Sequence, residues 1–147
     1  MNQYTARKLI AQRWMTLWPS LSSSTPYAFD DDPCDKAASY AILAVEFGDE
    51  LQRTFGQPGN RKFTCPGEIE FELYAAPATG KKRLDEMIGY VKSMFDSVAF
   101  GTGDDLIQCF TISQYGYSSK GSSAAVGSSG QHAFSMLSVD FEHYEVR

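Results

Sequence analysis

The strongest constraint on the fold is a six-residue stretch, EIEFEL at residues 68–73, in which glutamates alternate with apolar residues. Successive side chains of a β-strand point to opposite faces of the sheet. One face of this strand must therefore belong to a hydrophobic core, while the other must face water. The water-facing residues are Glu68, Glu70 and Glu72.

Apolar residues recur at helical spacing on both sides of this strand. Residues 2–18 predict a helix that Pro19 ends, and residues 80–98 predict a second amphipathic helix. The apolar stripe of the first helix comprises Ala6, Ile10, Trp14 and Leu17. The stripe of the second helix comprises Leu84, Met87, Ile88, Val91, Phe95 and Val98.

Further strands are predicted at residues 38–47, 105–113 and 132–145, beside a strand at residues 67–75. The core residues expected from the last two strands in the sequence are Ile107, Cys109, Phe110, Ile112, Phe134, Met136, Leu137, Val139 and Phe141. This order of elements predicts a single α+β domain over residues 1–147. The N-terminal helix and the central helix are expected to pack on a largely antiparallel or mixed sheet.

Two segments have too few apolar residues to be buried in such a domain. Residues 48–66 are polar on both sides of Gly56–Gly59, which predicts a projecting hairpin arm. The basic residues of this arm are Arg53, Arg61 and Lys62. Residues 118–130 are rich in serine and glycine and predict a flexible loop.

The stretch YAAPATGKKRLDEM at residues 74–87 has the outline of a phosphate-binding loop, because Gly80-Lys81 lies between a strand and a helix. The motif G-x-x-x-x-G-K-[ST] would place a glycine at position 75 and a hydroxyl at position 82. The chain has Ala75 and Lys82 there. Without the glycine and the magnesium ligand, we expect a strand-to-helix turn that binds no nucleotide.

Other residues that could support chemistry are not arranged for it. His132 and His143 lie eleven residues apart in the predicted final strand and are expected at the surface, on opposite faces. The aspartates within residues 30–35 lack the glycine and glutamate of a calcium loop, so a solvated loop is expected. The sequence thus predicts no catalytic residue, no cofactor-binding residue, no metal ligand and no enzyme.

The overall charge also limits the possible function. A formal net charge of −5 and a pI near 4.9 argue against a protein that holds nucleic acid by neutralising phosphates. They do not exclude a protein that lets DNA pass. Cys34, Cys65 and Cys109 form no C-x-x-C pair and are expected to be buried or half-buried thiols in a reducing cytosol. The chain has no segment typical of a signal peptide or a membrane span.

The order of these pieces resembles the tail terminator (tail completion) proteins of long-tailed bacteriophages. The similarity covers residues 3–145 and is strongest from Phe47 to Phe95. The segments that carry it are VEFGDELQRTFGQPGNRKFTCPG, EIEFELYAAPATG, a helix ending VKSMF, and the closing strand FSMLSVDFEHYEV. Residues 118–130 do not take part in the resemblance.

The resemblance implies a virion structural protein that assembles in the host cytoplasm as a hexameric ring. Such a ring caps the tail tube, ends its polymerisation and presents a surface to the head-completion or connector protein. DNA would pass through it without specific binding, so Glu68, Glu70 and Glu72 would suit a lumenal surface. Arg53, Arg61 and Lys62 are expected to meet a neighbouring subunit or the tail tube protein, through this glutamate row or the Asp30–Asp32 cluster.

Three alternatives remain at the level of sequence. A head–tail joining (neck) protein is a close competitor, because neck proteins are also small α+β subunits that form rings. A cytosolic adaptor could use the arm at residues 48–66 to bind a partner. A small hydrolase would require a Ser-His-Asp arrangement, which is recognised by geometry, and no G-x-S-x-G motif indicates one.

Overall fold

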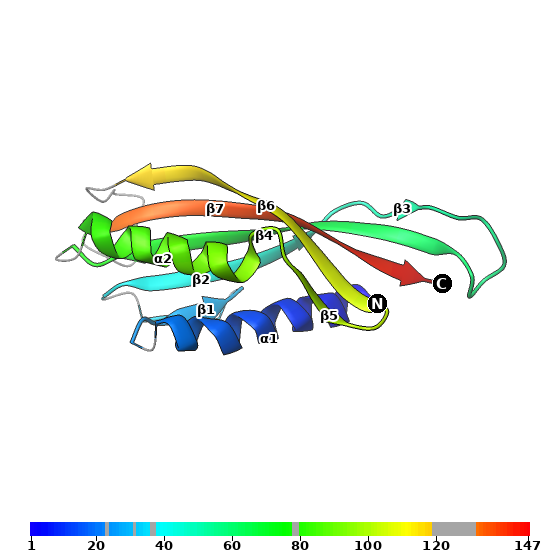
Figure 1. Ribbon diagram of the computed structural model, residues 1–147, viewed down its shortest axis with the longest axis horizontal. Coiled ribbons are helices and arrows are strands. Elements are labelled where there is room, and N and C mark those ends of the chain that lie inside the picture. The colour runs from blue at the N-terminus through cyan, green and yellow to red at the C-terminus, as the bar shows by residue number, and fades with distance from the viewer. Residues whose placement is uncertain (23, 31, 36–37, 78–79, 119–131) are drawn as a thin grey trace.

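A computed structural model describes residues 1–22, 24–30, 32–35, 38–77, 80–118 and 132–147. The molecule is elongated, and a hairpin arm projects at one end beyond the two chain termini (Figure 1). The helices are α1 (Gln3–Leu21) and α2 (Gly80–Phe95). The strands are β1 (Tyr27–Phe29), β2 (Tyr40–Phe47), β3 (Leu51–Gln52), β4 (Lys62–Ala75), β5 (Ala99–Thr102), β6 (Asp105–Ser118) and β7 (Ala133–Val146).

The strands form one mixed sheet in the order β1-β2-β4-β7-β6-β5, with β3 added beside β4. Only the pairing of β1 with β2 is parallel among the described strands. The longest pairing joins β4 to β7, from Lys62 opposite Val146 to Ala75 opposite Ala133. The predicted α+β fold, with two helices on a largely antiparallel sheet and a projecting arm, is confirmed.

The core lies between the helices and one face of the sheet. Ile69, Phe71 and Leu73 are fully buried there, as the EIEFEL alternation predicts. The α2 side chains that pack on them are Leu84, Met87, Ile88, Val91, Met94 and Phe95. From α1 the buried residues are Ala6, Ile10, Trp14 and Trp18.

The two tryptophans of α1 are buried, and the indole N–H of each forms a hydrogen bond. Trp14 donates from Nε1 to the Ala28 carbonyl at 3.0 Å, and Trp18 donates to the Thr25 carbonyl at 3.1 Å. These bonds attach the helix to β1 and to the segment that leads into it. Trp18 also accounts for a wrong boundary: α1 runs through Pro19 to Leu21 because Trp18 is held in the core and its carbonyl accepts the Ser22 N–H at 2.8 Å.

Several predicted positions differ in the structure. The short strands β1 and β5 were not predicted, because three and four residues give no periodic pattern. Phe110 is 46 % exposed rather than buried, since its neighbour Cys109 occupies the core face of β6. Phe134 and Met136 lie half-buried on the opposite face of β7 from Leu137, Val139 and Phe141. The loop predicted at residues 118–130 lies outside the described residues, except Ser118, which ends β6.

The histidines were also placed wrongly. His132 and His143 are 3 % and 0 % exposed, respectively, instead of lying at the surface. His143 lies beside Phe141, with ring centroids 6.5 Å apart, and its burial lowers its pKa. His132 packs edge-on against Tyr40. The three thiols agree with the prediction, because Cys65 and Cys109 are buried and Cys34 is half-buried.

Candidate functional site

The most distinctive surface is the sheet face opposite the core, which we call the open face. It carries Glu68, Glu70 and Glu72 of β4, and neither described helix packs on it. At one end of this face Tyr40 and Tyr74 stack in a small buried cluster, with ring centroids 4.5 Å apart. The three glutamates are half-buried rather than fully wet. Their carboxylates are therefore less solvated than the sequence suggests.

Strand register extends this row of glutamates into a larger acidic cluster. Glu68 lies opposite Glu46 of β2 on one side and opposite Asp140 of β7 on the other. The pKa of Glu68 is raised, first because the carboxyl is partly desolvated, and then because Glu70, Asp140 and Glu46 repel its charge. Like charges on directly opposed strand positions destabilise a sheet. The cluster thus opposes folding, and residues 68–73 alone do not reveal it.

We expect Glu68→Gln to stabilise the protein at neutral pH. A raised carboxyl pKa means that ionisation disfavours the folded state, so the penalty is absent at low pH and grows as the pH rises through the raised pKa. The gain should be roughly 0.2–1 kcal/mol at pH 7. It should vanish near pH 4 and below, where the unfolded chain also becomes protonated. Urea denaturation at several pH values measures this difference.

Asp85→Asn is the matched control, because Asp85 is an exposed carboxylate on α2. It should show no comparable gain that appears between pH 4 and pH 7. A stability difference for Glu68→Gln that is the same at both pH values would contradict electrostatic repulsion as its cause.

A shallow groove of about 360 Å³ lies where the acidic cluster meets β6. Carboxylates and aromatic rings share its lining, and the ring of Phe110 is 46 % exposed beside it. We call this the acidic groove. Its other lining residues are Glu46, Phe47, Gly48, Pro66, Gly67, Glu68, Asp140, Phe141 and Glu142. Farther along β6, Tyr115 is 60 % exposed, and its pKa is raised by burial and then by the nearby glutamates of β4.

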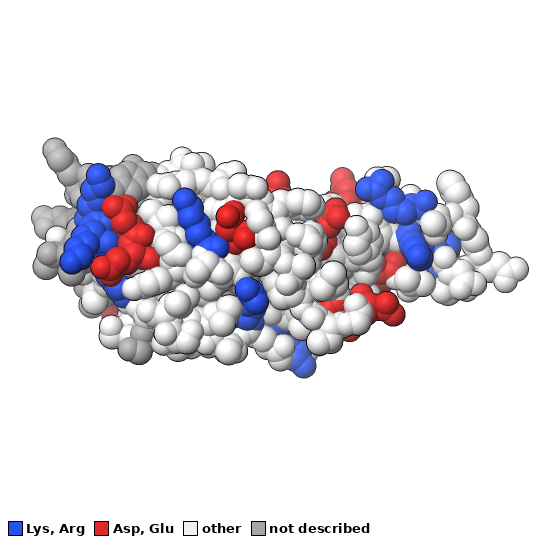
Figure 2. All heavy atoms as spheres, in the orientation of Figure 1, with Lys and Arg blue, Asp and Glu red and all other residues white. Residues whose placement is uncertain are grey.

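The predicted basic residues lie beyond the acidic cluster, at or before Lys62, the first residue of β4. Figure 2 shows one group of basic side chains toward the arm end of the molecule and another at the opposite end. Arg53 donates from Nε to the Thr64 hydroxyl at 2.9 Å, and Arg61 donates to the Arg147 carbonyl at 3.3 Å. Within the described part of the chain, neither residue nor Lys62 forms an ion pair. The arm therefore carries cations without carboxylate partners.

The other acidic cluster named by the sequence has a structural use. Asp30 forms an ion pair with Arg7 and accepts the Val45 N–H at 3.0 Å, so it joins α1 to β2. Asp32 is exposed, whereas Asp31 lies outside the described residues. Asp30 is thus already paired within its own chain, whereas Glu46, Glu68 and Asp140 form no ion pair among the described residues.

A cluster at the base of the arm was missed by sequence reasoning. Potential ligand atoms of Glu50, Cys65 and Glu145 lie within 4.8 Å of one another. Glu50 comes from the arm, Cys65 from β4 and Glu145 from β7. Arg147 bridges both carboxylates and lies 4.0 Å from the Phe63 ring centroid. The guanidinium supplies the counter-charge that a metal ion would otherwise provide. This cluster therefore fastens the arm to β7.

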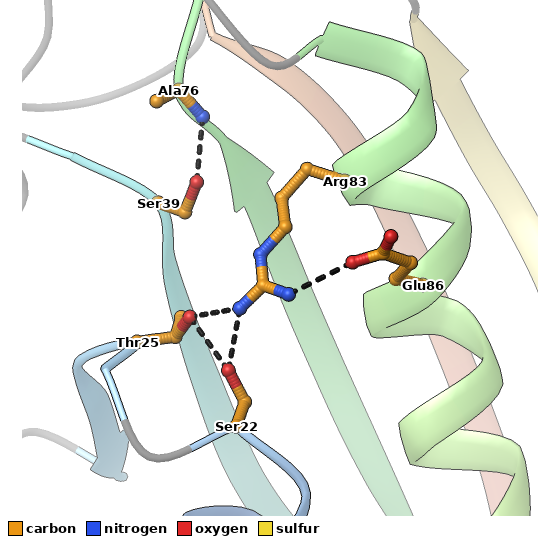
Figure 3. Close-up of polar contacts among 6 residues, drawn as sticks. All are labelled: Ser22, Thr25, Ser39, Ala76, Arg83 and Glu86. Atoms are coloured by element: carbon orange, nitrogen blue, oxygen red, sulfur yellow. Dashed lines mark hydrogen bonds and ion pairs between the residues drawn. The ribbon is translucent and has the colours of Figure 1, made fainter.

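Residues 74–87, which have the outline of a phosphate-binding loop, lie at the end of the molecule opposite the arm. Arg83, one turn into α2, donates to the hydroxyls of Ser22 and Thr25 and pairs with Glu86 at 3.0 Å (Figure 3). Ser39 accepts the Ala76 N–H at 2.8 Å beside it. The bonds from Arg83 tie α2 to the segment that follows α1. Residues 78–79 are outside the described part, so the absence of nucleotide binding stays a prediction.

No protein-family model matches the chain, and no curated protein sequence matches it. Neither described helix is long and apolar enough to cross a membrane. A function for this chain therefore has to be argued from the arrangement of its own residues.

Proposed function

We propose that the protein is a virion structural subunit that forms a ring, caps the tail tube of a long-tailed phage and ends its polymerisation. The observation that carries this proposal is the separation of charge on one chain. A projecting arm carries Arg53, Arg61 and Lys62 without carboxylate partners, and the open face carries a cluster of carboxylates. Two such unlike surfaces favour head-to-tail contact between copies, and this contact closes into a ring when the rotation completes a circle.

The acidic surface also suits the inside of a DNA conduit. Glu70 and Glu72 are half-buried on the open face and are not among the residues that line the acidic groove. Carboxylates repel the phosphates of passing DNA, so the genome would not adhere to the ring. The tail tube protein would contact one rim, and the head-completion or connector protein would contact the other.

A neck protein would also form a ring through which DNA passes. A tail terminator differs from it in controlling the length of the tail. In a phage that carries this gene, loss of the protein should give overlong tail tubes in electron micrographs if it is a terminator. Complete heads beside separate tails of normal length would instead identify a neck protein. An adaptor would affect neither particle.

Assembly can be tested first with the purified protein. A hexamer of the 16.3 kDa chain has a mass of about 98 kDa. Light scattering coupled to size-exclusion chromatography should detect this species, and negative-stain micrographs should show rings. Because the proposed contact involves opposite charges, rising salt should shift the protein toward monomer. A monomer at every concentration and at low salt would contradict the ring.

A further inference from the structure

Phe55 is the most exposed large apolar side chain among the described residues, with 94 % of its surface accessible. It lies on the arm between Arg53 and Arg61, next to Gly56. A single exposed phenylalanine is unremarkable on its own. Here it belongs to the projecting hairpin, two residues before the turn at Gln57–Asn60, and is flanked by cations that form no ion pair among the described residues. An aromatic anchor with basic neighbours is typical of a segment that inserts into a partner.

The acidic groove has the complementary composition. Phe110 offers an exposed ring, and Glu68 and Asp140 stand beside it with Glu46 and Glu142. Partial burial together with mutual repulsion raises the pKa of Glu68, so a cation placed there would relieve an unfavourable interaction. The groove thus fits a guanidinium and an aromatic ring together.

The tip of the arm cannot reach the groove of its own chain, although the first and last residues of the arm, Gly48 and Pro66, line that groove. Arg53 N–H donates to the Lys62 carbonyl at 2.7 Å, and Lys62 N–H donates to the Thr54 hydroxyl at 2.9 Å. These bonds keep the two sides of the hairpin together and direct its tip away from the sheet centre. Along β4 the groove begins at Pro66, which is roughly 20 Å of strand from the arm tip. A Phe55 side chain in this groove would therefore come from another molecule.

We propose that Phe55 of one copy inserts beside Phe110 in the acidic groove of a second copy. Arg53 and Arg61 of the first copy then face the groove carboxylates, including Glu68 and Asp140 of the second. This inference rests on the proposed ring and names the contact between neighbouring subunits. Because arm and groove are different surfaces, each copy gives one arm and receives another.

A second groove, of about 560 Å³, offers a competing site. It is lined by Met1, Lys62, Gly103, Asp104, Leu106, Tyr144 and Val146. Its exposed apolar side chains could hold a phenylalanine. However, Lys62 offsets Asp104 there, so it lacks the excess negative charge that favours the basic arm. The acidic groove is the better match.

Disulfide trapping tests the contact directly. In a Cys34→Ser background, Phe55→Cys combined with Phe110→Cys should give covalently linked multimers under mild oxidation, whereas each single variant should stay uncrosslinked. Cys65 and Cys109 are buried and are retained. The competing pair, Phe55→Cys with Tyr144→Cys, should not crosslink. Crosslinking of this second pair in place of the first would overturn the assignment of the groove.

Substitution gives a second readout. Phe55→Ser and Phe110→Ser should each weaken self-association by at least about tenfold in sedimentation equilibrium, without lowering the melting temperature. Tyr4→Ser is the control, because Tyr4 is 75 % exposed on α1, outside both grooves. Unchanged association of Phe55→Ser in a protein that still forms rings would overturn the arm contact and leave the ring standing.

If the wild-type protein is monomeric, the ring is contradicted, but binding of the arm to the groove can still be tested. A fluorescent synthetic peptide of residues 50–62 should then bind the wild-type protein in anisotropy titrations at low salt and should not bind Phe110→Ser. Binding that depends on Phe110 would support the groove. Absence of binding to the wild type would overturn it.

Discussion

Val91→Asp is expected to unfold the protein or to destabilise it by several kcal/mol. Val91 is fully buried in α2, on the stripe that packs against the core face of the sheet. A carboxylate at this position would lose its hydration and gain no cation, so it would ionise at a high cost or remain protonated with unsatisfied polar atoms. Since a domain is stable by only about 5–15 kcal/mol, this is a large fraction of the total.

Chemical denaturation followed by circular dichroism measures the effect. Gly89→Asp is the matched control, because it places the same side chain on α2 where a Cβ meets nothing within 4 Å. We expect it to change stability by less than about 1 kcal/mol, since aspartate is tolerated better than glycine in a helix. If Val91→Asp unfolds at the same denaturant concentration as the wild type, α2 does not pack on the sheet as described.

Gly67→Ala is expected to destabilise the protein by about 1–3 kcal/mol, or by more if the strands must separate. Gly67 lies in β4 where the Phe141 ring crosses the strand, and an added Cβ would lie 2.3 Å from that ring. The same Cβ would lie 2.7 Å from the Glu46 carbonyl oxygen. That backbone atom belongs to a paired strand and cannot rotate away. Differential scanning calorimetry would record the loss as a lower melting temperature.

Gly48→Ala is the control for this substitution. An added Cβ at Gly48 would meet Pro66 at 3.5 Å, which is an ordinary contact, so little change is expected. If Gly67→Ala has the same melting temperature as Gly48→Ala and the wild type, then Phe141 does not pack across Gly67.

The parts of the fold that follow from local pattern could be predicted. The alternation in residues 68–73 defines both faces of β4, and the helical stripe in residues 80–98 locates α2 within three residues of its end. Phe110 could not be placed by hydrophobicity alone. It follows a buried cysteine directly in β6, and adjacent strand residues point to opposite faces.

The site depends on distant pairings that no local pattern encodes. Glu68 is recognisable in the sequence, but its approach to Glu46 and Asp140 comes from two strand registers. Nothing in the sequence around Gly67 indicates that the Phe141 ring packs on it. His143 is buried by aromatic rings that include Phe47 of β2, which is distant in the sequence. Arg53 and Arg61 could be assigned to the arm, because the segment around them has too few apolar residues to be buried. The predicted arm at residues 48–66 extends too far, since β4 begins at Lys62 and Cys65 is buried. The tie between Arg147 and Glu50 could not be predicted from the sequence.

The position of β7 has a consequence for how the chain folds. β7 lies between β4 and β6, although both neighbours precede it in the sequence. Until β7 is synthesised, β4 and β6 each lack a partner along an edge that becomes interior. The pairing of β4 with β7 joins segments far apart in the chain and is slow, because a large loop must close before contacts compensate for it. Nascent chains would therefore expose two long strand edges, and rapid synthesis at high temperature would favour aggregation over folding.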